Sequence, residues 1–565
     1  MAYKPLPIGV DDFGKIIENE YYYIDKTELI KELIDKHGDV NLFTRPRRFG
    51  KTLNLSMLKY FFEKPVDGRN NKNYFAKLKI MDAGEKYTSK QEKYPVIFLT
   101  LKSAKQRSYK NAYICLIEAI ANEFQRHSYV LDKISLQADY DKFYSIMSRK
   151  ADEGDYLTSI AFLSKCLYEY HAQKVIILLD EYDVPLENAY YAGFYEEMTS
   201  FIRSIFESSL KTNPYLEFAV ITGCLRISKE SIFTGMNNLN IISVLNDDYA
   251  EHFGFVEKEV RDMLKFYDRE SHMDMVKEWY NGYKFGRTDV YNPWSVINFV
   301  SVLVSNEEAF PTAAWSNTSS NNIVKDLIYK ADNVVKEEIQ SLINGGTIEK
   351  KVHEDITYND IYASEDNLWN FLFFTGYLKK ADMRMEIDGR YITMEIPNKE
   401  VRAIYVDKIS TWFRDNIKLQ NLSVMYEAML KGDAETLEQE VAKQLRRTIS
   451  YMDNTEAFYH GFMLGLMTNL SEYIVKSNRE AGNGRYDISI YDYDVSKSPI
   501  IFKLKVADKY KNLPQSCDKA LQQIKEKDYA QVFAEEGYTE VICYGIGFFH
   551  KQMSVKVERI KIEEE

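Results

Sequence analysis

Apolar and amphipathic segments alternate along the first 240 residues of the chain. Runs such as YPVIFLTL (94–101) are almost wholly apolar, as in strands buried on both faces, whereas KTLNLSMLKYFF (51–62) repeats its apolar residues with helical spacing. The pattern predicts strands within 39–50, 94–101, 174–183 and 216–226, and helices at 51–62, 111–127, 157–170 and 194–210. Such alternation predicts an α/β fold, with a parallel sheet covered by helices on both faces.

The chain from about 240 to 415 is mostly helical, with one interruption. RMEIDGRYITMEIP (384–397) holds two alternating segments joined by Asp388 and Gly389, which is a strong hairpin signal. Helical segments precede and follow it, at 365–380 and 398–415. Helices followed by such a hairpin suggest a winged-helix module. A module of this kind either touches DNA or serves as an internal packing or regulatory element.

The final segment, residues 418–565, begins with helices and ends in a second, smaller α/β pattern. Its predicted strands contain GRYDISIYDY (484–493), SPIIFKLKV (498–506) and TEVICYGIGFF (539–549), and its main helix is SCDKALQQIKEKDYAQVF (516–533). We therefore expect a division of the chain at about residues 240 and 417.

Composition and charge narrow the class of protein. Hydrophobic residues make up 45% and charged residues 28% of the 565 positions, as in soluble globular proteins. A net charge of −12 would repel nucleic acid, so any DNA contact must come from local basic patches. The sequence shows no apolar run of about 18 residues and no leader-like start, and its five cysteines are scattered. We expect a cytoplasmic protein with reduced thiols and no membrane span.

RPRRFGKT (45–52) lies between a predicted strand and a predicted helix, where a phosphate-binding loop belongs. Arg45 stands in place of the first glycine of G-x-x-x-x-G-K-[ST], whereas Gly50, Lys51 and Thr52 match the pattern. Backbone N–H groups at a helix N-terminus cradle phosphate oxygens, and Gly50 permits their close approach. We expect Lys51 to bind the β and γ phosphates of ATP and Thr52 to ligate Mg²⁺.

A second motif, VIILLDEYD (175–183), supplies acids at the end of a buried strand. Asp180 and Glu181 follow the apolar run, at the carboxyl end of the strand, where α/β proteins bind ligands. Asp180 is expected to hold hydrated Mg²⁺ and Glu181 to polarise the attacking water. The strand at 94–101 lies between the two motifs along the chain, and we interpret it as the added central strand that some ATPases contain.

The strand at 216–226 ends in ITGCLR, which offers Thr222 and Arg226 near the γ-phosphate. Arg226 would sense or stabilise the transferred charge. The alternative for Arg226 is a surface arginine that follows a strand.

Several segments accompany these motifs: LPIGVDDFGKI, YYYIDKTELI, FTRPRRFGKT, LLDEYD, TGCLRISKESIFTGMNNL, and WYNGYKFG followed by VYNPWSV. Together they resemble the AAA-ATPase-like family, whose members carry a C-terminal domain of the PD-(D/E)XK nuclease superfamily. The resemblance implies a P-loop ATPase coupled to a nuclease-like module, with ATP and Mg²⁺ as cofactors and nucleic acid, DNA above all, as partner. The arginine-rich loop is a trait of this family, which places Arg45 and Arg48 among the nucleotide-binding residues.

In this family the terminal domain resembles N-R-E-x-G-x-G-R-x-D-I-x-I, followed by a strand with E-x-K and a helix with glutamine. The residues that match are Glu480, Arg485, Asp487, Lys505, Gln523 and Tyr529. The resemblance implies that Glu480 and Asp487 ligate a metal and that Asp487 and Lys505 are catalytic.

Lys503 stands where the pattern has a glutamate. A magnesium site for phosphodiester hydrolysis needs clustered oxygen ligands, and a nearby ammonium repels each positive charge by roughly 4 kcal/mol at 4 Å. We expect hydrolysis to be severely impaired. Three alternatives stay open: an active nuclease that tolerates Lys503, an ordinary strand with solvated lysines, or a patch in which Lys503 and Lys505 bind a phosphate backbone without cutting it.

The sequence thus predicts an ATPase domain (1–240), a helical lid and winged-helix region (241–417), and a helical linker with a restriction-endonuclease-like α/β domain (418–565). The alternative is a non-catalytic nucleic-acid-binding or scaffold protein that uses ATP as a conformational switch. A homo-oligomer follows if Arg226 acts on a neighbour's nucleotide, whereas a monomer suffices if it acts on its own.

Overall fold

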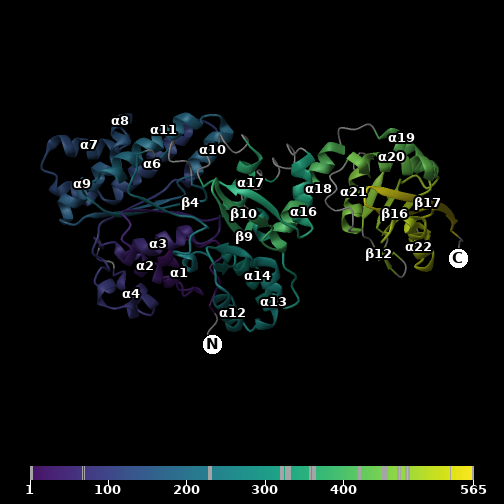
Figure 1. Cartoon of the computed structure of the whole chain (residues 1–565), viewed down its shortest axis with the longest axis horizontal. Coiled ribbons are helices and arrows are strands. Elements are labelled where there is room, and N and C mark those ends of the chain that lie inside the picture. Colours follow the sequence, from purple (N-terminus) through teal and green to yellow (C-terminus); the bar gives the residue numbers. More distant parts are fainter. Residues whose placement is uncertain are drawn as a thin grey trace. The chain divides into compact units, whose positions relative to one another are not determined.

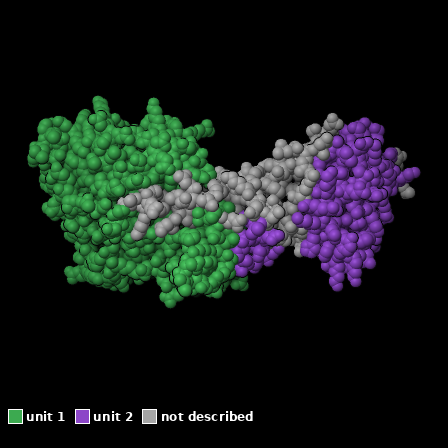
Figure 2. Space-filling view, turned by 45° about the horizontal axis from the view of Figure 1, so that its top comes forward, with its two compact units in different colours: residues 1–317, 349–401 green, residues 318–348, 402–565 purple. Residues whose placement is uncertain are grey.

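The computed structural model describes the chain in two compact units. Unit 1 holds residues 1–317 and 349–401, and unit 2 holds residues 318–348 and 402–565 (Figure 2). Outside the described residues lie 1–3, 67, 69, 227–231, 234, 318–323, 325–332, 355–357, 359–363, 418–421, 448–455, 468–469, 471–472, 478–479, 482–483, 486, 535 and 563–565, and also the side chains of 333, 336, 340, 365, 409–417, 447, 457, 480, 481, 484 and 485. The predicted boundary at residue 240 falls inside unit 1, and the three-part division stays a prediction.

A five-stranded parallel sheet forms the centre of unit 1, as the alternating pattern predicted. Its strands lie in the order β2-β3-β4-β1-β5, and every neighbouring pair is parallel. They are β1 (Val40–Thr44), β2 (Val96–Thr100), β3 (Val175–Asp180), β4 (Leu216–Gly223) and β5 (Leu239–Ile242). The expected α/β fold is confirmed.

The strand between the two motif-bearing strands β1 and β3 is β4, not β2. The interpretation of 94–101 as the added central strand is therefore wrong, because β2 lies at the edge of the sheet. The burial of the strands agrees with this order: β3 is buried at every position, whereas Phe98 and Thr100 of β2 are partly exposed. A central strand of a parallel sheet is covered on both faces, but an edge strand is not.

Helices cover both faces of this sheet. Figure 1 shows α6, α9 and α11 on one side and α1, α2 and α3 on the other. The helices of this region are α1 (Phe13–Glu18), α2 (Glu28–Lys36), α3 (Lys51–Phe62), α4 (Lys72–Phe75), α5 (Glu85–Thr88), α6 (Tyr109–Arg126), α7 (Gln137–Met147), α8 (Glu153–Leu157), α9 (Ser159–His171), α10 (Val184–Ala192) and α11 (Tyr195–Phe206).

The remainder of unit 1 contains a helical cluster and a small sheet. Helices α12 (Glu257–Phe266), α13 (Met273–Tyr280) and α14 (Pro293–Ser305) share one apolar core, beside the hairpin of β6 (Tyr283–Phe285) and β7 (Thr288–Val290). The predicted hairpin is confirmed, since β9 (Lys379–Glu386) pairs antiparallel with β10 (Gly389–Glu395) across Asp388. Strand β8 (Ile348–Val352) completes a sheet of order β8-β10-β9, and α17 (Glu365–Phe374) and α18 (Lys399–Ile417) flank the hairpin in sequence.

Unit 2 contains a mixed sheet with helices on both faces. The order is β11-β14-β15-β16-β17, in which only β15 and β16 are parallel. The strands of this sheet are β11 (Ile474–Ser477), β14 (Ile488–Tyr491), β15 (Ile500–Val506), β16 (Glu540–Phe549) and β17 (Gln552–Lys561), and β12 (Glu480–Ala481) and β13 (Gly484–Arg485) form a separate two-stranded sheet. The helices of unit 2 are α16 (Asn333–Ile343), α19 (Ser423–Lys431), α20 (Ala434–Arg447), α21 (Glu456–Leu466) and α22 (Leu513–Glu526). Helices α19–α21 share one apolar cluster with β15, whereas α22 shares the other.

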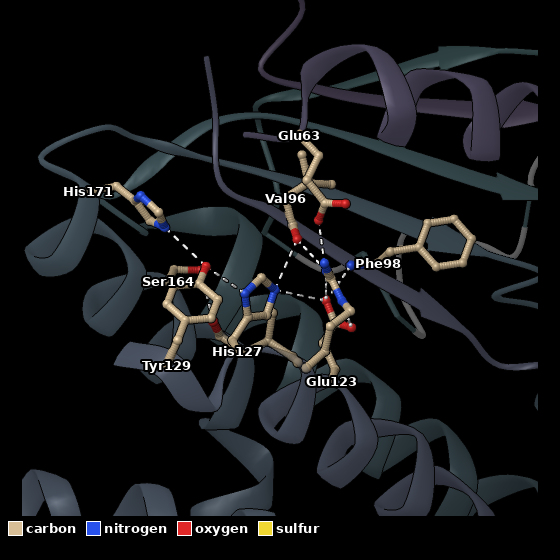
Figure 3. A network of polar contacts seen from close by, with 10 residues as sticks. Glu63, Val96, Phe98, Glu123, His127, Tyr129, Ser164 and His171 are labelled. Atoms are coloured by element: carbon tan, nitrogen blue, oxygen red, sulfur yellow. Dashed lines mark hydrogen bonds and ion pairs between the residues drawn. The ribbon is translucent and has the colours of Figure 1, made fainter. Parts of the chain in front are cut away.

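Charged side chains cover the edge strand β2 (Figure 3). Glu123 Oε1 accepts a hydrogen bond from Phe98 N at 2.7 Å, and Arg126 Nη2 donates to Val96 O at 2.5 Å. Arg126 also forms ion pairs with Glu123, at 2.6 Å, and with Glu63. Edge strands expose unpaired backbone groups that invite pairing with another chain. The network satisfies two of these groups and fixes α6 against the sheet.

Replacing Glu123 by glutamine should lower the free energy of unfolding by about 2 kcal/mol, because it removes one charge of a buried, hydrogen-bonded pair. Burial alone would raise the pKa of Glu123, but Arg126 and His127 hold it below the ordinary 4.5. The stabilisation is therefore present above about pH 4.5 and is lost as the pH falls. Denaturant unfolding at pH 7 measures the effect. The control is Glu118→Gln, on the same helix as Glu123, which breaks an exposed ion pair with Arg149. Equal losses of stability in both variants would contradict the assignment.

Candidate nucleotide site and nuclease-like site

The loop between β1 and α3 has the conformation of a phosphate-binding turn. Gly50 is the N-cap residue of α3 and has a φ of +81°, in the left-handed region that glycine adopts without steric cost. Helix α3 begins at Lys51, so its first unpaired N–H groups follow Gly50 directly. A helix N-terminus of this kind attracts the negative charge of phosphate.

Two of the predicted residues, Thr52 and Thr222, bind the buried carboxylate of a third, Asp180. Asp180 is completely buried; its Oδ2 accepts a hydrogen bond from Thr52 Oγ1 and its Oδ1 accepts one from Thr222 Oγ1, both at 2.8 Å. Burial raises the pKa of Asp180, and the neighbouring Glu181 raises it further, whereas the two hydroxyl groups lower it. The structure thus brings the end of β3, the start of α3 and the end of β4 to a single point.

Lys51 points into the same region. Its Nζ donates to Arg45 O at 3.0 Å and to Pro46 O at 3.1 Å, and it lies 3.6 Å from Cys224 Sγ and 3.9 Å from Glu181 Oε1. Burial alone would lower the pKa of Lys51, but Cys224, where its thiol ionises, and the carboxylates of Glu181, Asp183 and Asp180 raise it above 10.5. The buried side chain therefore carries a positive charge at the phosphate-binding turn.

Two residues beside Lys51 were not among those predicted from the sequence. Asp183 and Cys224 are buried, and their ligand atoms, with one of Glu181, all lie within 4.8 Å of one another. Burial raises the pKa of the Cys224 thiol to about 12, so it is neutral at pH 7. The signal for Asp183 was the second aspartate of DEYD; Cys224 follows Thr222 by two positions, and only the pairing of β3 with β4 shows that it lies beside Asp183.

Glu181 follows β3 in a left-handed conformation, with a φ of +55°. Residues other than glycine adopt this conformation at a cost of order 1 kcal/mol, and such residues gather at functional sites. The turn carries the carboxylate of Glu181 out of the line of the strand, towards Lys51.

Two arginines of the loop, Arg45 and Arg48, make their side-chain contacts outside this cluster. Arg45 is completely buried, donates from Nη1 to Ile242 O at 3.0 Å, and stacks on the ring of Phe285 at 4.8 Å. The contacts of Arg45 are thus with the protein interior, and its nucleotide contact stays a prediction. Arg48 is exposed, with its guanidinium 4.3 Å from the ring centre of Trp294; its nucleotide contact stays a prediction.

Arg226 lies beside the β8-β10-β9 sheet. Its Nη1 is 3.8 Å from Glu354 Oε2, and Glu354 Oε1 accepts a hydrogen bond from Arg390 Nη1 at 3.0 Å. These side chains line a cavity of about 440 Å³ within unit 1, together with those of Val352, His353, Asn367 and Met385. The predicted sensor arginine thus connects the end of β4 to the hairpin region.

In unit 2, Asp487 and Lys503 form a buried ion pair. Lys503 Nζ donates to Asp487 Oδ1 at 2.8 Å, and Leu504 N donates to Asp487 Oδ2 at 2.6 Å. Lys503 is 6% and Asp487 8% exposed, so water reaches little of either side chain. Both carboxylate oxygens of the predicted metal ligand therefore have partners from β15.

The other predicted residues of this site are placed only in part. Lys505 is half-buried and lies in register with Gly547 of β16. Nε2 of Gln523, which lies on α22, is 3.4 Å from Oη of Tyr529. The side chain of Glu480 lies outside the described residues, as does that of Arg485, so their predicted places beside Asp487 stay predictions.

Comparison with known proteins matches two parts of the chain, one in each unit, to families. Residues 7–233 match the family described as "Predicted AAA-ATPase", and residues 454–558 match the PD-(D/E)XK nuclease superfamily. The chain is also 24% identical, over 570 aligned residues and 98% of each chain, to an uncharacterized protein in the vnfD 5′ region of Azotobacter chroococcum mcd 1. Among the helices in the described part of the chain, none has both the length and the apolar character to cross a membrane. The chain therefore carries an AAA-ATPase-like domain at residues 7–233 and a PD-(D/E)XK nuclease superfamily domain at residues 454–558.

Proposed function

We propose that this protein binds and hydrolyses ATP and that hydrolysis is coupled to a nuclease-fold domain that engages nucleic acid without cutting it efficiently. The observation that carries the first part is the convergence of Thr52 and Thr222 on Asp180, next to a buried, charged Lys51 at the start of α3. Strands β1, β4 and β3 bring these groups to the carboxyl edge of the sheet, where ligands of α/β proteins bind.

The residues fit magnesium and a triphosphate. The hydroxyl of Thr52 and the carboxylate of Asp180 are hard oxygen donors of the kind that Mg²⁺ prefers. When bound, magnesium would neutralise charge on the phosphate oxygens. Lys51 would turn from the loop carbonyl groups that it now contacts to the β and γ phosphates, while the N–H groups after Gly50 bind phosphate oxygens.

Two further residues complete the proposed hydrolytic site. Glu181, 3.9 Å from the ammonium of Lys51, would orient and polarise the attacking water. Arg226 would exchange Glu354 for the γ-phosphate and so report nucleotide state to the β8-β10-β9 sheet. That sheet, with α17, is the part of the chain that we assign to the winged helix.

Glu181→Gln should retain ATP binding and lose about 10²-fold in turnover, because the amide cannot accept a proton from water. Calorimetry measures binding and phosphate release measures turnover. Glu153→Gln, an exposed acid on α8, should behave like the unchanged protein. Nucleotide binding with no turnover in any of these proteins would instead support the switch that uses ATP without hydrolysing it.

For the nuclease-like domain we propose that Lys503 blocks metal-dependent cleavage. Its ammonium is hydrogen-bonded to one oxygen of Asp487 and Leu504 N to the other, so a metal ion at Asp487 would lie next to a fixed positive charge. A second positive charge at this distance would be repelled by several kcal/mol. The half-buried Lys505 on the same strand would still attract a phosphate backbone, which favours nucleic-acid binding over cleavage.

A further inference from the structure

Asp183 is a buried carboxylate that the proposed ATPase site does not yet use. It occupies the N-cap position of α10, yet its side chain makes no capping hydrogen bond to that helix. Instead its Oδ2 accepts from Cys224 N at 2.7 Å and from Leu225 N at 3.1 Å. An aspartate at an N-cap normally stabilises its own helix by accepting one of the first free N–H groups. Here the carboxylate is turned to the segment that follows β4.

Tyr182 also binds the segment that follows β4. Its backbone N donates to Thr222 O at 3.1 Å and its hydroxyl donates to Leu225 O at 2.6 Å. Gly223 makes this approach possible, because a Cβ there would lie 2.4 Å from the ring of Tyr182. Two consecutive residues after Glu181 therefore bind three of the four residues that precede Arg226, namely Thr222, Cys224 and Leu225.

We propose that Asp183 is a positioning residue, which holds the Cys224–Leu225 turn and so fixes Arg226 relative to the γ-phosphate; this inference rests on the proposed ATPase function. Arg226 directly follows the two residues whose N–H groups Asp183 binds. Glu181 lies two residues before Asp183, so the same short segment carries the proposed water-orienting acid and sets the place of the proposed sensor.

The surroundings of Asp183 agree with a positional task. Burial, and after it the charge of Glu181, raise its pKa to about 6, although Lys51, the N–H group of Cys224 and Arg47 act in the opposite direction. Burying a charged group away from water costs free energy unless the group is paired and hydrogen-bonded. Because the side chain does not cap α10, its hydrogen bonds to the end of β4 are the contacts that compensate for its burial.

The test is a double-mutant cycle in the full chain. Asp183→Ala should lower kcat for ATP by about 10²-fold with a nearly unchanged KM, because a displacement near 1 Å at a catalytic group costs about that much. Asp183→Asn keeps an acceptor oxygen and should recover part of the loss. In the Arg226→Ala background, Asp183→Ala should have little further effect on kcat. Asp152→Ala, at the exposed N-cap of α8, is the matched control.

A loss of the same size in both backgrounds, or no loss in either, would overturn the inference. Hydrogen exchange of the Cys224 and Leu225 amides gives a second result that does not depend on turnover: these amides should be protected in the unchanged protein and exposed in Asp183→Ala. Unaltered protection in a folded Asp183→Ala variant would also overturn it. If the amides exchange as expected but the protein does not turn over ATP, the proposed ATPase function is wrong, whereas the contact of Asp183 with the Cys224–Leu225 turn still stands.

Discussion

Lys51→Met should reduce ATP turnover by about 10²- to 10³-fold, the usual cost of removing one charged donor from a phosphoryl-transfer site. The ammonium of Lys51 is buried at the first position of α3, within 3.9 Å of Glu181. Methionine keeps the length and apolar stem of the side chain but has no charge to offer the phosphates. Binding should weaken together with turnover, because the lost contact exists in both the bound state and the transition state.

Lys59→Met is the matched control for this change. Lys59 lies near the other end of the same helix, 5.5 Å from the ring centre of Phe98, and has no place in the proposed site. Its variant should bind and hydrolyse ATP as the unchanged protein does. Calorimetry with ATP and Mg²⁺ measures binding, and phosphate release measures turnover. Equal turnover in the Lys51 and Lys59 variants would exclude this loop as the nucleotide site.

The sequence predicted four of the five strands of the parallel sheet in unit 1, missing β5, and it did not predict their order. The apolar run of β3 and the acids after it were enough to place Asp180 and Glu181 at a sheet edge, because burial on both faces leaves a clear pattern. The run in β2 is nearly as apolar, yet β2 is the edge strand. Order depends on how each crossover packs, and two apolar strands of similar length carry no signal that separates edge from centre.

The same limit applies to single side chains. Arg45 was assigned to the nucleotide because it lies in a loop motif, whereas the structure turns it inward to the carbonyl of Ile242. No local pattern marks that contact, since the two residues are far apart in the chain. Asp183 was not predicted for the same reason. Its partners Cys224 and Leu225 come close to it only through the pairing of β3 with β4.

For Lys503 the resemblance to the family pattern, which has a glutamate at this position, gave the expectation, and the structure added the contact that the lysine makes. The sequence indicated a cation close to an expected metal ligand. The structure shows that the cation and Asp487 neutralise each other within β14–β15, at 2.8 Å. A charge reversal at this position therefore changes both stability and metal affinity, and these two effects can be measured separately.

Lys503→Glu should create a metal-dependent site in unit 2. Two carboxylates would then lie where an ion pair now lies, with a repulsion of roughly 4 kcal/mol at a separation near 4 Å. The variant should melt well below the unchanged protein in EDTA, and Mg²⁺ or Mn²⁺ should restore much of that loss by binding between the acids. Divalent ions should leave the melting of the unchanged protein nearly the same. Cleavage of plasmid or single-stranded DNA should appear with the metal in the variant alone.

Lys503→Met separates the loss of the ion pair from the gain of a ligand. Removing one partner of a buried pair leaves Asp487 uncompensated and should cost about 3–5 kcal/mol, but a single carboxylate should give no comparable response to metal. Lys505→Met on the same strand should neither cost this much stability nor create a response to metal. Lys505 is half-buried and does not contact Asp487 through a hydrogen bond or ion pair in the described structure. If Lys503→Glu and the unchanged protein respond equally to Mn²⁺ in melting and in cleavage, the metal site does not depend on position 503 and the proposed block is wrong.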